Sequence, residues 1–231
     1  PDRRVDLAAR ESRHALARVA VSESGELDPQ RPNAELLLRA YASGIFPMVD
    51  PRKRRIEYFS PDPRAVIPLE RFHVPRSLAR VRAKRPFEIR SDTVFEEVIR
   101  ACGEPRAGRL ETWLDERLIS AYVDLHAHGF AHSVEAFREG RLVGGLYGVH
   151  IGAAFFGESM FSRPELGGTD ASKLCLVELV ERLRAGGFAL LDTQFATRHL
   201  ARFGCVEIPR ERYLALLEIA IRRRGEWSVG G

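Results

Sequence analysis

The 231-residue sequence lacks the features of several large classes of protein. Its three cysteines, Cys102, Cys175 and Cys205, are scattered and form no Cys-x-x-Cys pair, which disfavours a disulfide scaffold and a zinc ribbon. No stretch approaches the roughly 18 apolar residues that span a membrane. The first residues also lack the apolar centre of a signal peptide. We therefore expect a protein of the cytoplasm.

Common phosphate-binding loops and metal-ligand patterns are missing as well. The sequence contains no GxxxxGK[ST], and no GxGxxG follows a predicted strand. The glycines within 142–148 are better interpreted as points where a strand bends. His126, His128 and His132 are close together, but no carboxylate follows them at the spacing of metal ligands. We therefore expect no metal site.

Lysine is rare, although the chain carries 36 cationic residues and a formal charge of +4. All but three of these cations are arginines, a bias that partly reflects the base composition of the genome that encodes the protein. The run from Arg71 to Arg90 contains a single acid, Glu88, and its cations Arg76, Arg80 and Lys84 share one stripe of a short helix. Such a run is either an ordinary solvated face or a surface that binds phosphates.

Periodic apolar residues predict helices that alternate with short strands. Apolar runs at 133–137, 142–149 and 153–156, separated by charged or glycine-containing turns, predict an antiparallel meander. Other strands are expected at 87–89, 188–191 and 205–208, and helices at 5–20, 34–43, 93–101, 116–128, 171–185, 198–203 and 210–224. Asn33 and Asp170 are expected to cap two helices, and SPDPR at 60–64 to form a locally bonded turn. This order indicates an α+β fold with a mostly antiparallel sheet flanked by helices.

Polar side chains follow two of the predicted strands. Glu158 follows the meander within GESMFS, and Asp192 and Gln194 follow the strand at 188–191. Because strand side chains alternate, we expect Asp192 and Gln194 on one face, where a carboxylate and an amide can orient a nucleophile and relay a proton. In the alternative interpretation Asp192 caps a turn and Glu158 belongs to a structural ion pair.

A series of longer segments identifies a family. The chain resembles the leucyl/phenylalanyl-tRNA–protein transferases of bacteria through LLLRAYASGIFPM, YFSPDPRAVIPL, TWLDERLISAYVDLHAHGFAHSVEAF, LVGGLYGVHIGAAFFGESMFS, DASKLCLVELVERL and LLDTQFATRHLARFGCVEIPR. These segments occur in the family's order and cover about 36–210. The resemblance implies a small N-terminal domain, here 1–66, and a larger domain at 67–231 that is similar to the acyl-CoA N-acyltransferase (GNAT) fold.

The resemblance also implies a reaction. Leucine or phenylalanine, and possibly methionine, passes from its tRNA to the N-terminal amine of a protein beginning with Arg or Lys, which marks that protein for degradation. An aminoacyl ester is already activated, so no cofactor is expected. The enzyme has to hold the ester, orient a neutral amine and stabilise the tetrahedral oxyanion. We expect a monomer.

Individual positions of the family's motifs carry roles over to this chain. Asp192 and Gln194 match the D-x-Q motif that assists the attack of the amine. The pocket for the leucyl or phenylalanyl side chain is expected at Leu146, Phe155 and Met160, with Glu158 at its polar end. Tyr41, Trp113 and Tyr122 are expected around the terminal adenosine and the acceptor peptide, although core packing is an equal alternative for Tyr122. Phosphates of the tRNA acceptor stem are expected at Arg71, Arg76, Arg80 and Lys84.

The sequence departs from the family pattern at several places. Met48 stands where the family usually has Trp, and Tyr58 and Phe59 stand where it usually has two. The loop 163–170 is longer than usual, and residues 1–28 lack the usual glycine-rich run. These differences affect the expected donor and acceptor specificity more than the expected fold.

Two other functions remain open on the sequence. One is a GNAT-like acyltransferase that uses acyl-CoA, although RPELGGTD at 163–170 is a poor version of a pyrophosphate-binding loop. The other is a non-catalytic module that binds RNA or a degron. Asp192, Gln194 and Glu158 stand at the family's motif positions, which favours an enzyme.

Overall fold

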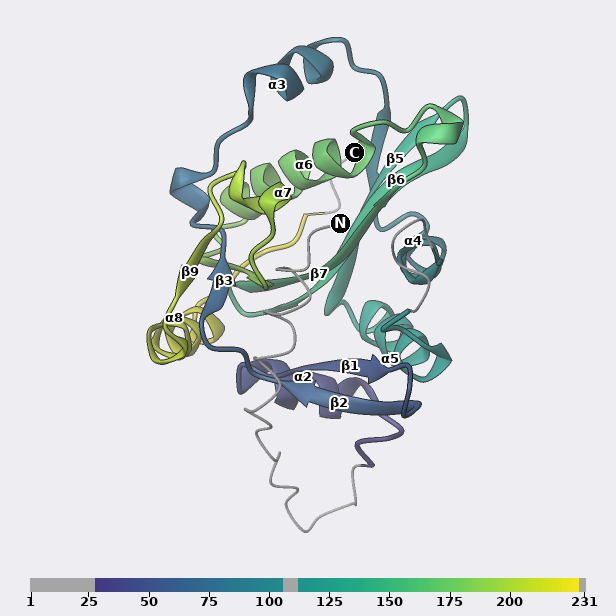
Figure 1. The fold of residues 1–231 in the computed structure, drawn as a ribbon. Helices are drawn as coiled ribbons and strands as arrows, with labels where there is room; N and C mark the ends of the chain where they lie inside the picture. Colours follow the sequence, from purple (N-terminus) through teal and green to yellow (C-terminus); the bar gives the residue numbers. More distant parts are fainter. Residues whose placement is uncertain (1–27, 106–111, 229–231) are drawn as a thin grey trace.

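The computed structural model describes residues 28–105 and 112–228, so the helix expected at 5–20 lies outside the described residues. Within them the chain forms a two-stranded sheet and a seven-stranded sheet (Figure 1). The order of the large sheet is β4-β5-β6-β7-β8-β3-β9. Its strands are β3 (Arg64–Val66), β4 (Glu88–Ser91), β5 (Ala131–Arg138), β6 (Arg141–Ile151), β7 (Ala154–Ser162), β8 (Leu190–Gln194) and β9 (Val206–Ile208).

The pairing of the large sheet confirms the predicted meander of β5, β6 and β7. β7 and β8 pair in parallel, and the other neighbouring strands of this sheet pair in antiparallel fashion. The prediction of where β7 and β8 end was wrong, because β7 continues through GESMFS to Ser162 and β8 continues to Gln194. Apolar runs mark only the part of a strand that faces a core on both sides, whereas backbone pairing continues past it.

Helices cover both faces of this sheet. They are α2 (Ala34–Ala42), α3 (Arg76–Ala83), α4 (Phe95–Gly103), α5 (Glu116–Ala127), α6 (Ala171–Ala185), α7 (Arg198–Ala201) and α8 (Arg210–Arg222), with short 3₁₀ turns η2 (Leu69–Arg71) and η3 (Pro164–Leu166). Helix α6 lies on one face with α3 beyond it, whereas α4 and α5 lie on the other (Figure 1). The α+β architecture expected from the sequence is confirmed.

Helix α6 shows how one face of the sheet is covered. Leu176, Leu179, Val180 and Leu183 are all buried against it, as their spacing predicts. The prediction that Asp170 caps this helix was wrong. The Asp170 backbone lies in the left-handed region, with φ 66°, and its side chain makes no capping hydrogen bond. The Asp170 carboxylate instead contacts the ammonium of Lys173.

The N-terminal segment packs below the large sheet in the view of Figure 1. It contains α2 and the hairpin of β1 (Phe46–Asp50) and β2 (Arg55–Phe59). Asn33 caps α2 as predicted, because its side chain accepts from the backbone N–H of Leu36 at 2.9 Å. β3 follows this hairpin and joins the large sheet between β8 and β9.

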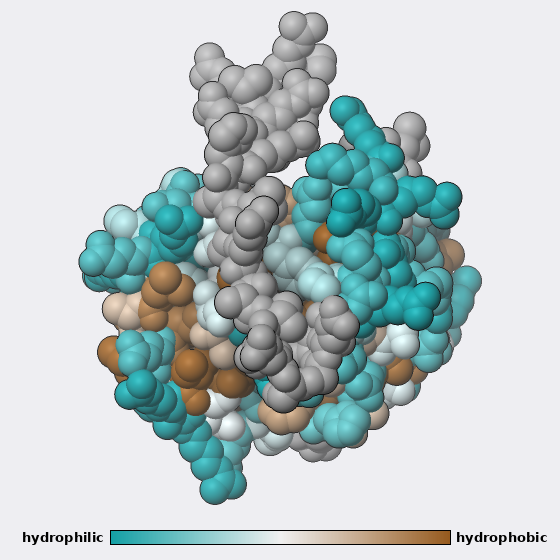
Figure 2. Space-filling view, turned by 90° about the horizontal axis from the view of Figure 1, so that it is seen from below, coloured by the Kyte–Doolittle hydropathy of each residue, from teal (hydrophilic) through white to brown (hydrophobic). Residues whose placement is uncertain are grey.

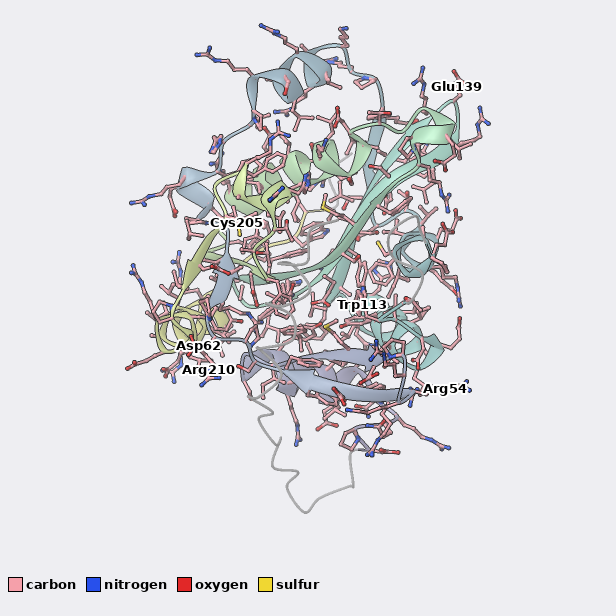
Figure 3. All side chains as sticks on the ribbon, in the orientation of Figure 1. Arg54, Asp62, Trp113, Glu139, Cys205 and Arg210 are labelled. Carbon is pink, nitrogen blue, oxygen red and sulfur yellow. The ribbon has the colours of Figure 1, made fainter. Side chains whose placement is uncertain are left out.

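The SPDPR segment links this hairpin to α8. The Asp62 carboxylate accepts from the backbone N–H of Arg210 at 3.0 Å, and the carbonyl of Ser60 accepts from the Arg210 guanidinium at 3.2 Å (Figure 3). Ser60 and Asp62 were predicted to bond local backbone, whereas the bonds seen here go to Arg210. Their partner lies about 150 residues further along the chain, as the sequence separations of 148 and 150 show.

The segment after α8 runs back across the end of α6. The backbone N–H of Glu226 donates to the carbonyl of Gly186 at 2.9 Å, and Arg182 donates to the carbonyl of Ser228 at 2.8 Å. Helix α8 itself exposes Leu214, Leu216 and Ile219. Apolar residues gather on the α8 side in the view from below (Figure 2). No helix within 28–105 and 112–228 is both long and apolar enough to cross a membrane.

Candidate active site

The candidate site lies where β7 and β8 separate. The two strands pair from Ala154–Leu190 to Phe156–Asp192. Beyond this point β7 stays against β6, whereas β8 pairs with β3, so that Gln194 lies opposite Ala65. The polar residues predicted from the sequence lie at this fork. Strands that diverge leave backbone groups and side chains between them available to a ligand, which makes the fork a suitable place for chemistry.

Glu158 reaches the fork through an irregularity of β7. Tyr147 of β6 pairs with Ser159 and Gly148 pairs with Gly157, so Glu158 is the extra residue of a β-bulge. Its carboxylate accepts from Gln194 Nε2 at 3.1 Å and from the hydroxyl of Tyr122 at 3.3 Å. The bulge therefore aims a partly buried carboxylate at the neighbouring strand.

Asp192 is buried and fully occupied by donors. Arg64 binds it in bidentate fashion, with Nε 2.9 Å from Oδ1 and Nη2 2.6 Å from Oδ2, and both side chains are at most 1% exposed. The hydroxyl of Tyr213 donates to Oδ2 at 2.8 Å, and the backbone N–H of Gln194 donates to Oδ1 at 2.9 Å. These four bonds leave the Asp192 carboxylate little capacity to take a proton from a substrate.

Gln194 is held in an unusual backbone conformation. Its φ of 57° lies in the left-handed region, which a glutamine rarely adopts. The bond from its N–H to Asp192 stabilises this conformation and turns the side chain towards Glu158. Because Nε2 is the atom that donates to Glu158, the amide carbonyl is the acceptor that Gln194 offers to a substrate. Asp192 and Gln194 therefore lie on one face, as predicted, but only Gln194 and Glu158 meet across the fork.

Burial sets the protonation of this network. It raises the pKa of Glu158 to about 7, and the nearby charge of Asp192 adds to the shift, whereas hydrogen bonds from the tyrosines and the charge of Arg64 oppose it. Burial works against the charged form of Arg64, but the Asp192 carboxylate holds the Arg64 pKa above its ordinary value. Glu158 thus exchanges a proton near neutral pH, while Arg64 stays charged.

Two residues of this site, Arg64 and Tyr213, were not predicted from the sequence. Arg64 belongs to SPDPR, whose prolines indicate a turn, and Tyr213 is one of several inward residues of α8. Nothing in either segment points to Asp192, which lies 128 residues after Arg64. The only available signal was that an arginine between apolar residues at the start of a strand needs a partner if it is buried.

Two family models match the chain. The model of the leucyl/phenylalanyl-tRNA protein transferase matches residues 66–218, and the model of that transferase's N-terminal domain matches residues 25–62. The chain belongs to this family. A leucyl/phenylalanyl-tRNA–protein transferase of Paramagnetospirillum magneticum is 58% identical over 181 residues, covering 78% of this chain and 85% of the relative. The transferase of Phenylobacterium zucineum is 54% identical over 200 residues, covering 86% and 89%.

Solved structures with similar folds are more distant. PaiA N-acetyltransferase of Thermoplasma acidophilum in complex with coenzyme A matches with a TM-score of 0.33 and 20% identity, covering 44% of this chain and 74% of that one. The C-terminal domain of a lysylphosphatidylglycerol synthetase of Agrobacterium fabrum matches with a TM-score of 0.37 and 12% identity, covering 84% and 58%. These scores are too low to carry an argument about function.

The residues expected to form the aminoacyl pocket lie apart from Glu158. Leu146 and Phe155 are buried in the core cluster on the α6 side of the sheet, and Met160 packs against that cluster. Tyr122, which binds Glu158, belongs to the cluster on the opposite side. The bulge at Glu158 keeps Met160 on the side of Phe155, because an extra residue reverses which of the following side chains of β7 face α6.

The aromatic residues expected around the adenosine lie on the Glu158 side. Tyr41 and Tyr122 are fully buried, and their hydroxyls lie 2.6 Å apart, so the two rings extend the hydrogen-bond network inward from Glu158. Trp113 is half-buried where the large sheet meets the β1–β2 hairpin (Figure 3). Close to the fork, Phe195 is 38% exposed and packs edge-on against Phe46.

The expected phosphate-binding residues remain free of acidic partners. Arg71, Arg76, Arg80 and Lys84 are exposed, and none of them pairs with an acid within 28–105 or 112–228. Arg82 and Arg90 of the same run do form ion pairs, with Glu181 and Glu88. The arginine run therefore contains two arginines that pair with acids and four cations that remain available to an anionic partner.

Proposed function

We propose that this protein transfers leucine or phenylalanine from aminoacyl-tRNA to the N-terminal amine of proteins that begin with Arg or Lys, and so marks them for degradation. The observation that supports this most directly is the 3.1 Å bond between Gln194 and Glu158 across the fork, in a chain of the transferase family. This bond joins a neutral amide, which donates through Nε2, and a carboxylate that exchanges its proton near pH 7. Such a pair suits the attack of an amine at neutral pH.

In this proposal the amine nitrogen attacks the carbonyl carbon of the aminoacyl ester. A C–N bond forms, the carbonyl oxygen becomes a tetrahedral oxyanion, and the C–O bond to the ribose then breaks. The proton that the amine loses ends on the departing ribose oxygen. The carbonyl of Gln194 accepts a hydrogen bond from the attacking amine and orients its lone pair, while Glu158 binds the amine of the donor amino acid.

Asp192 acts through Gln194 rather than on the substrate. Its carboxylate already accepts from Arg64, Tyr213 and the Gln194 backbone. We therefore assign Asp192 a positioning role, in which its bond to the backbone N–H maintains the left-handed conformation of Gln194. This assignment differs from a general base, which would need a free oxygen within reach of the proton.

The donor side chain would enter the α6 side of the sheet, next to Leu146, Phe155 and Met160. In this proposal the apolar pocket selects by size and shape, so that Leu and Phe, which branch one carbon further from the backbone, fit better than the β-branched Ile or Val. The terminal adenosine would lie on the other side of the fork, near Trp113 and the tyrosine pair. The fork between β7 and β8 then separates the recognition of the side chain from the reaction of the ester.

The tRNA itself would lie against α3. Its phosphates fit the open cations Arg71, Arg76, Arg80 and Lys84, which can bind a backbone without reading its sequence. A transferase that uses charged tRNA works where protein synthesis occurs, so we place the protein in the cytoplasm and expect it to act as a monomer without a cofactor.

The reaction is tested by incubating the protein with radiolabelled leucyl-tRNA and a peptide that begins with Arg, and measuring labelled peptide. A peptide that begins with Asp serves as the control acceptor and should remain unlabelled. Acetyl-CoA replaces leucyl-tRNA in a parallel arm. Acetylation of the peptide, without transfer from any aminoacyl-tRNA, would exclude the proposal in favour of an acyl-CoA-dependent enzyme.

The surface of α3 is tested separately by tRNA binding. The double substitution Arg76→Ala with Arg80→Ala should weaken binding and reduce its dependence on salt, because fewer counterions are released. Arg212→Ala removes an equally exposed arginine from α8 and is the matched control. If both variants bind tRNA alike over a range of salt concentrations, α3 does not contact the tRNA.

A further inference from the structure

A cavity of about 180 Å³ lies between the start of α3, the start of α6 and α7. Its polar lining comprises Ser77 of α3, Asp170 and Lys173 at the start of α6, and His199 and Arg202 of the α7 turn. Phe203 supports one wall, with its ring 5.4 Å from that of His199. Three helices thus bring their polar side chains to one hollow.

The charges around this cavity favour an anion. Lys173 and Arg202 carry positive charges, and Asp170 carries the one negative charge among the lining residues. Arg202 is exposed and forms no ion pair within the described part of the chain. The Asp170 carboxylate contacts Lys173 and neutralises it, so Arg202 supplies a net positive charge even when His199 is neutral.

The pKa of His199 responds to the charges around the cavity. Burial lowers its pKa, Lys173 and Arg202 lower it further by repulsion, and Asp170 opposes them. A histidine surrounded by cations gains its proton more easily when an anion binds, so the imidazole can become a third positive partner. The cavity is therefore able to increase its own charge in response to the ligand.

The backbone adds donors to the same hollow. Pro75 precedes α3 and lines the cavity, and no side chain caps the first turn of that helix. The start of α6 is already occupied, because the N–H of Ala171 donates to the carbonyl of Gly168 at 3.0 Å and that of Ser172 donates to Ser162 Oγ at 2.9 Å. The first N–H groups of a helix point along its axis and prefer an anion. The start of α3 therefore supports the cationic side chains.

We infer that this cavity binds a phosphate group of the donor RNA close to its aminoacylated end. The inference rests on the proposed function. Helix α7 follows β8 after only three residues, 195–197, so the cavity lies on the segment that continues from Gln194. The cavity also borders the helix that carries Arg76 and Arg80. It therefore connects the fork, where the ester reacts, with the surface proposed to bind the rest of the RNA.

The decisive experiment compares a donor that has phosphates with a donor that has none, each tested with variants of the cavity. Leucyl-tRNA carries phosphates next to its terminal nucleoside, whereas 3′-O-leucyl-adenosine carries none. The variants are Arg202→Ala and Lys173→Met, and Arg212→Ala is the matched control. We expect KM for leucyl-tRNA to rise roughly ten-fold in each variant, as for the loss of a charge-assisted hydrogen bond, with kcat within two-fold of the unsubstituted protein.

Transfer from leucyl-adenosine should change by less than two-fold in the same variants. The dependence of leucyl-tRNA binding on salt should become shallower, by about 0.7 in the logarithmic slope for each phosphate of a single strand that the variant no longer neutralises. Equal losses with both donors would indicate a structural defect and overturn the inference. Unchanged KM for leucyl-tRNA would overturn it as well.

A second measurement does not depend on catalysis. Inorganic phosphate is titrated into the full-length protein while the imidazole signals of His199 are followed by NMR. Phosphate in the cavity should raise the pKa of His199, and Arg202→Ala should weaken that response several-fold. If His199 does not respond to phosphate, the cavity is not an anion site even if the protein transfers leucine. If His199 responds but no aminoacyl-tRNA serves as donor, the proposed function fails and the anion site remains.

Discussion

Two polar clusters lie within the large sheet, and they face different surroundings. The first, the Arg64 cluster, comprises Arg64, Asp192, Tyr213, Gln194 and Glu158. The second, the Asp92 cluster, comprises Asp92, His132, His150 and Trp227. Each contains a carboxylate with several donors. They differ in what lies beyond those donors.

The Asp92 cluster is closed on itself. Asp92 accepts from Trp227 Nε1 at 2.8 Å and from the backbone N–H of Ser133 at 2.8 Å, and its carboxylate also lies 2.8 Å from His132 Nδ1. The indole of Trp227 stacks on His132, with ring centroids 4.4 Å apart. Burial lowers the pKa of His150 to about 4, so this imidazole is neutral at pH 7. The C-terminal segment thus seals the cluster.

The Arg64 cluster continues to the fork between β7 and β8. Its inner member, Asp192, is saturated, but its outer pair, Gln194 and Glu158, lies where two strands part. A buried polar network therefore indicates function only where its outermost residues are still able to contact a ligand. The Asp92 cluster contains the same kinds of groups, but Trp227 covers it, so we expect it to contribute to stability.

The largest effect is expected from removing the ion pair that supports the fork. Arg64→Ala leaves Asp192 buried and unpaired, which should lower the free energy of unfolding by about 3–5 kcal/mol. Arg82→Ala breaks an ion pair whose side chains are 46% and 45% exposed, and should cost about 0–1 kcal/mol. Urea denaturation of both variants measures the difference. Similar values would mean that the Asp192 carboxylate finds other partners.

The second largest effect is expected from removing the side chain of Gln194 at the fork, compared with a change at the preceding residue of the same strand. Gln194→Ala should lower kcat for aminoacyl transfer about 100-fold, as for the loss of one positioned hydrogen-bonding group, with little change in stability. Thr193→Val alters the adjacent residue, which bonds the carbonyl of Ala65 at 3.3 Å, and should retain transfer. Steady-state kinetics with leucyl-tRNA measure both. Equal activity in the two variants would remove Gln194 from the mechanism.

The Asp92 cluster should respond in the opposite way. Asp92→Asn cannot accept from all three partners, so the free energy of unfolding should fall by about 1–3 kcal/mol while kcat stays within two-fold. Burial raises the pKa of Asp92, but the hydrogen bond and charge of His132 oppose it, and the pKa in the folded protein is lowered. The Asp92 carboxylate therefore stabilises the fold at pH values above its unfolded pKa, and this stabilisation is lost as the pH falls through the lower folded pKa. Thermal unfolding of both proteins from pH 7 to 3 tests this. A ten-fold loss of kcat would show that the two clusters are coupled.

The smallest effect concerns the protonation of Glu158. Its pKa is raised to about 7 in the folded protein, so the folded state binds this proton more tightly than the unfolded state. Stability from this group is therefore present at acid pH and declines as the pH rises through about 7, a decline that Glu158→Gln should remove. The ratio of kcat/KM for the two proteins should also change a few-fold between pH 6 and 8. A constant ratio would mean that this proton does not affect transfer.

Much of the scaffold was predictable because it depends on local patterns. The β5–β7 meander follows from three apolar runs with turns between them, and α6 follows from the spacing of Leu176, Leu179, Val180 and Leu183. Asp192 and Gln194 were predicted on one face from the alternation of a strand. The ends of β7 and β8 were not predicted, because polar residues there continue the backbone pairing.

The arrangement of the site was harder to predict from the sequence. The bulge at Glu158 places Met160 on the α6 side together with Phe155, and a strict alternation of side chains does not reveal such an extra residue. The cavity of about 180 Å³ also joins α3 to α6 and α7, and a long stretch of chain separates α3 from the other two helices. Sequence spacing carries no information about contacts of this kind.

The sequence by itself determined the family, the α+β order of elements and the identity of Asp192, Gln194 and Glu158 as polar residues on two strands. Only the tertiary structure decided how they divide the work. It buries Arg64 against Asp192, which is why we propose a positioning role for this carboxylate, and it desolvates Glu158, which raises the pKa of that carboxylate to about 7. The physical reason is that the charge state of a carboxylate depends on the groups packed around it, and folding alone brings those groups together.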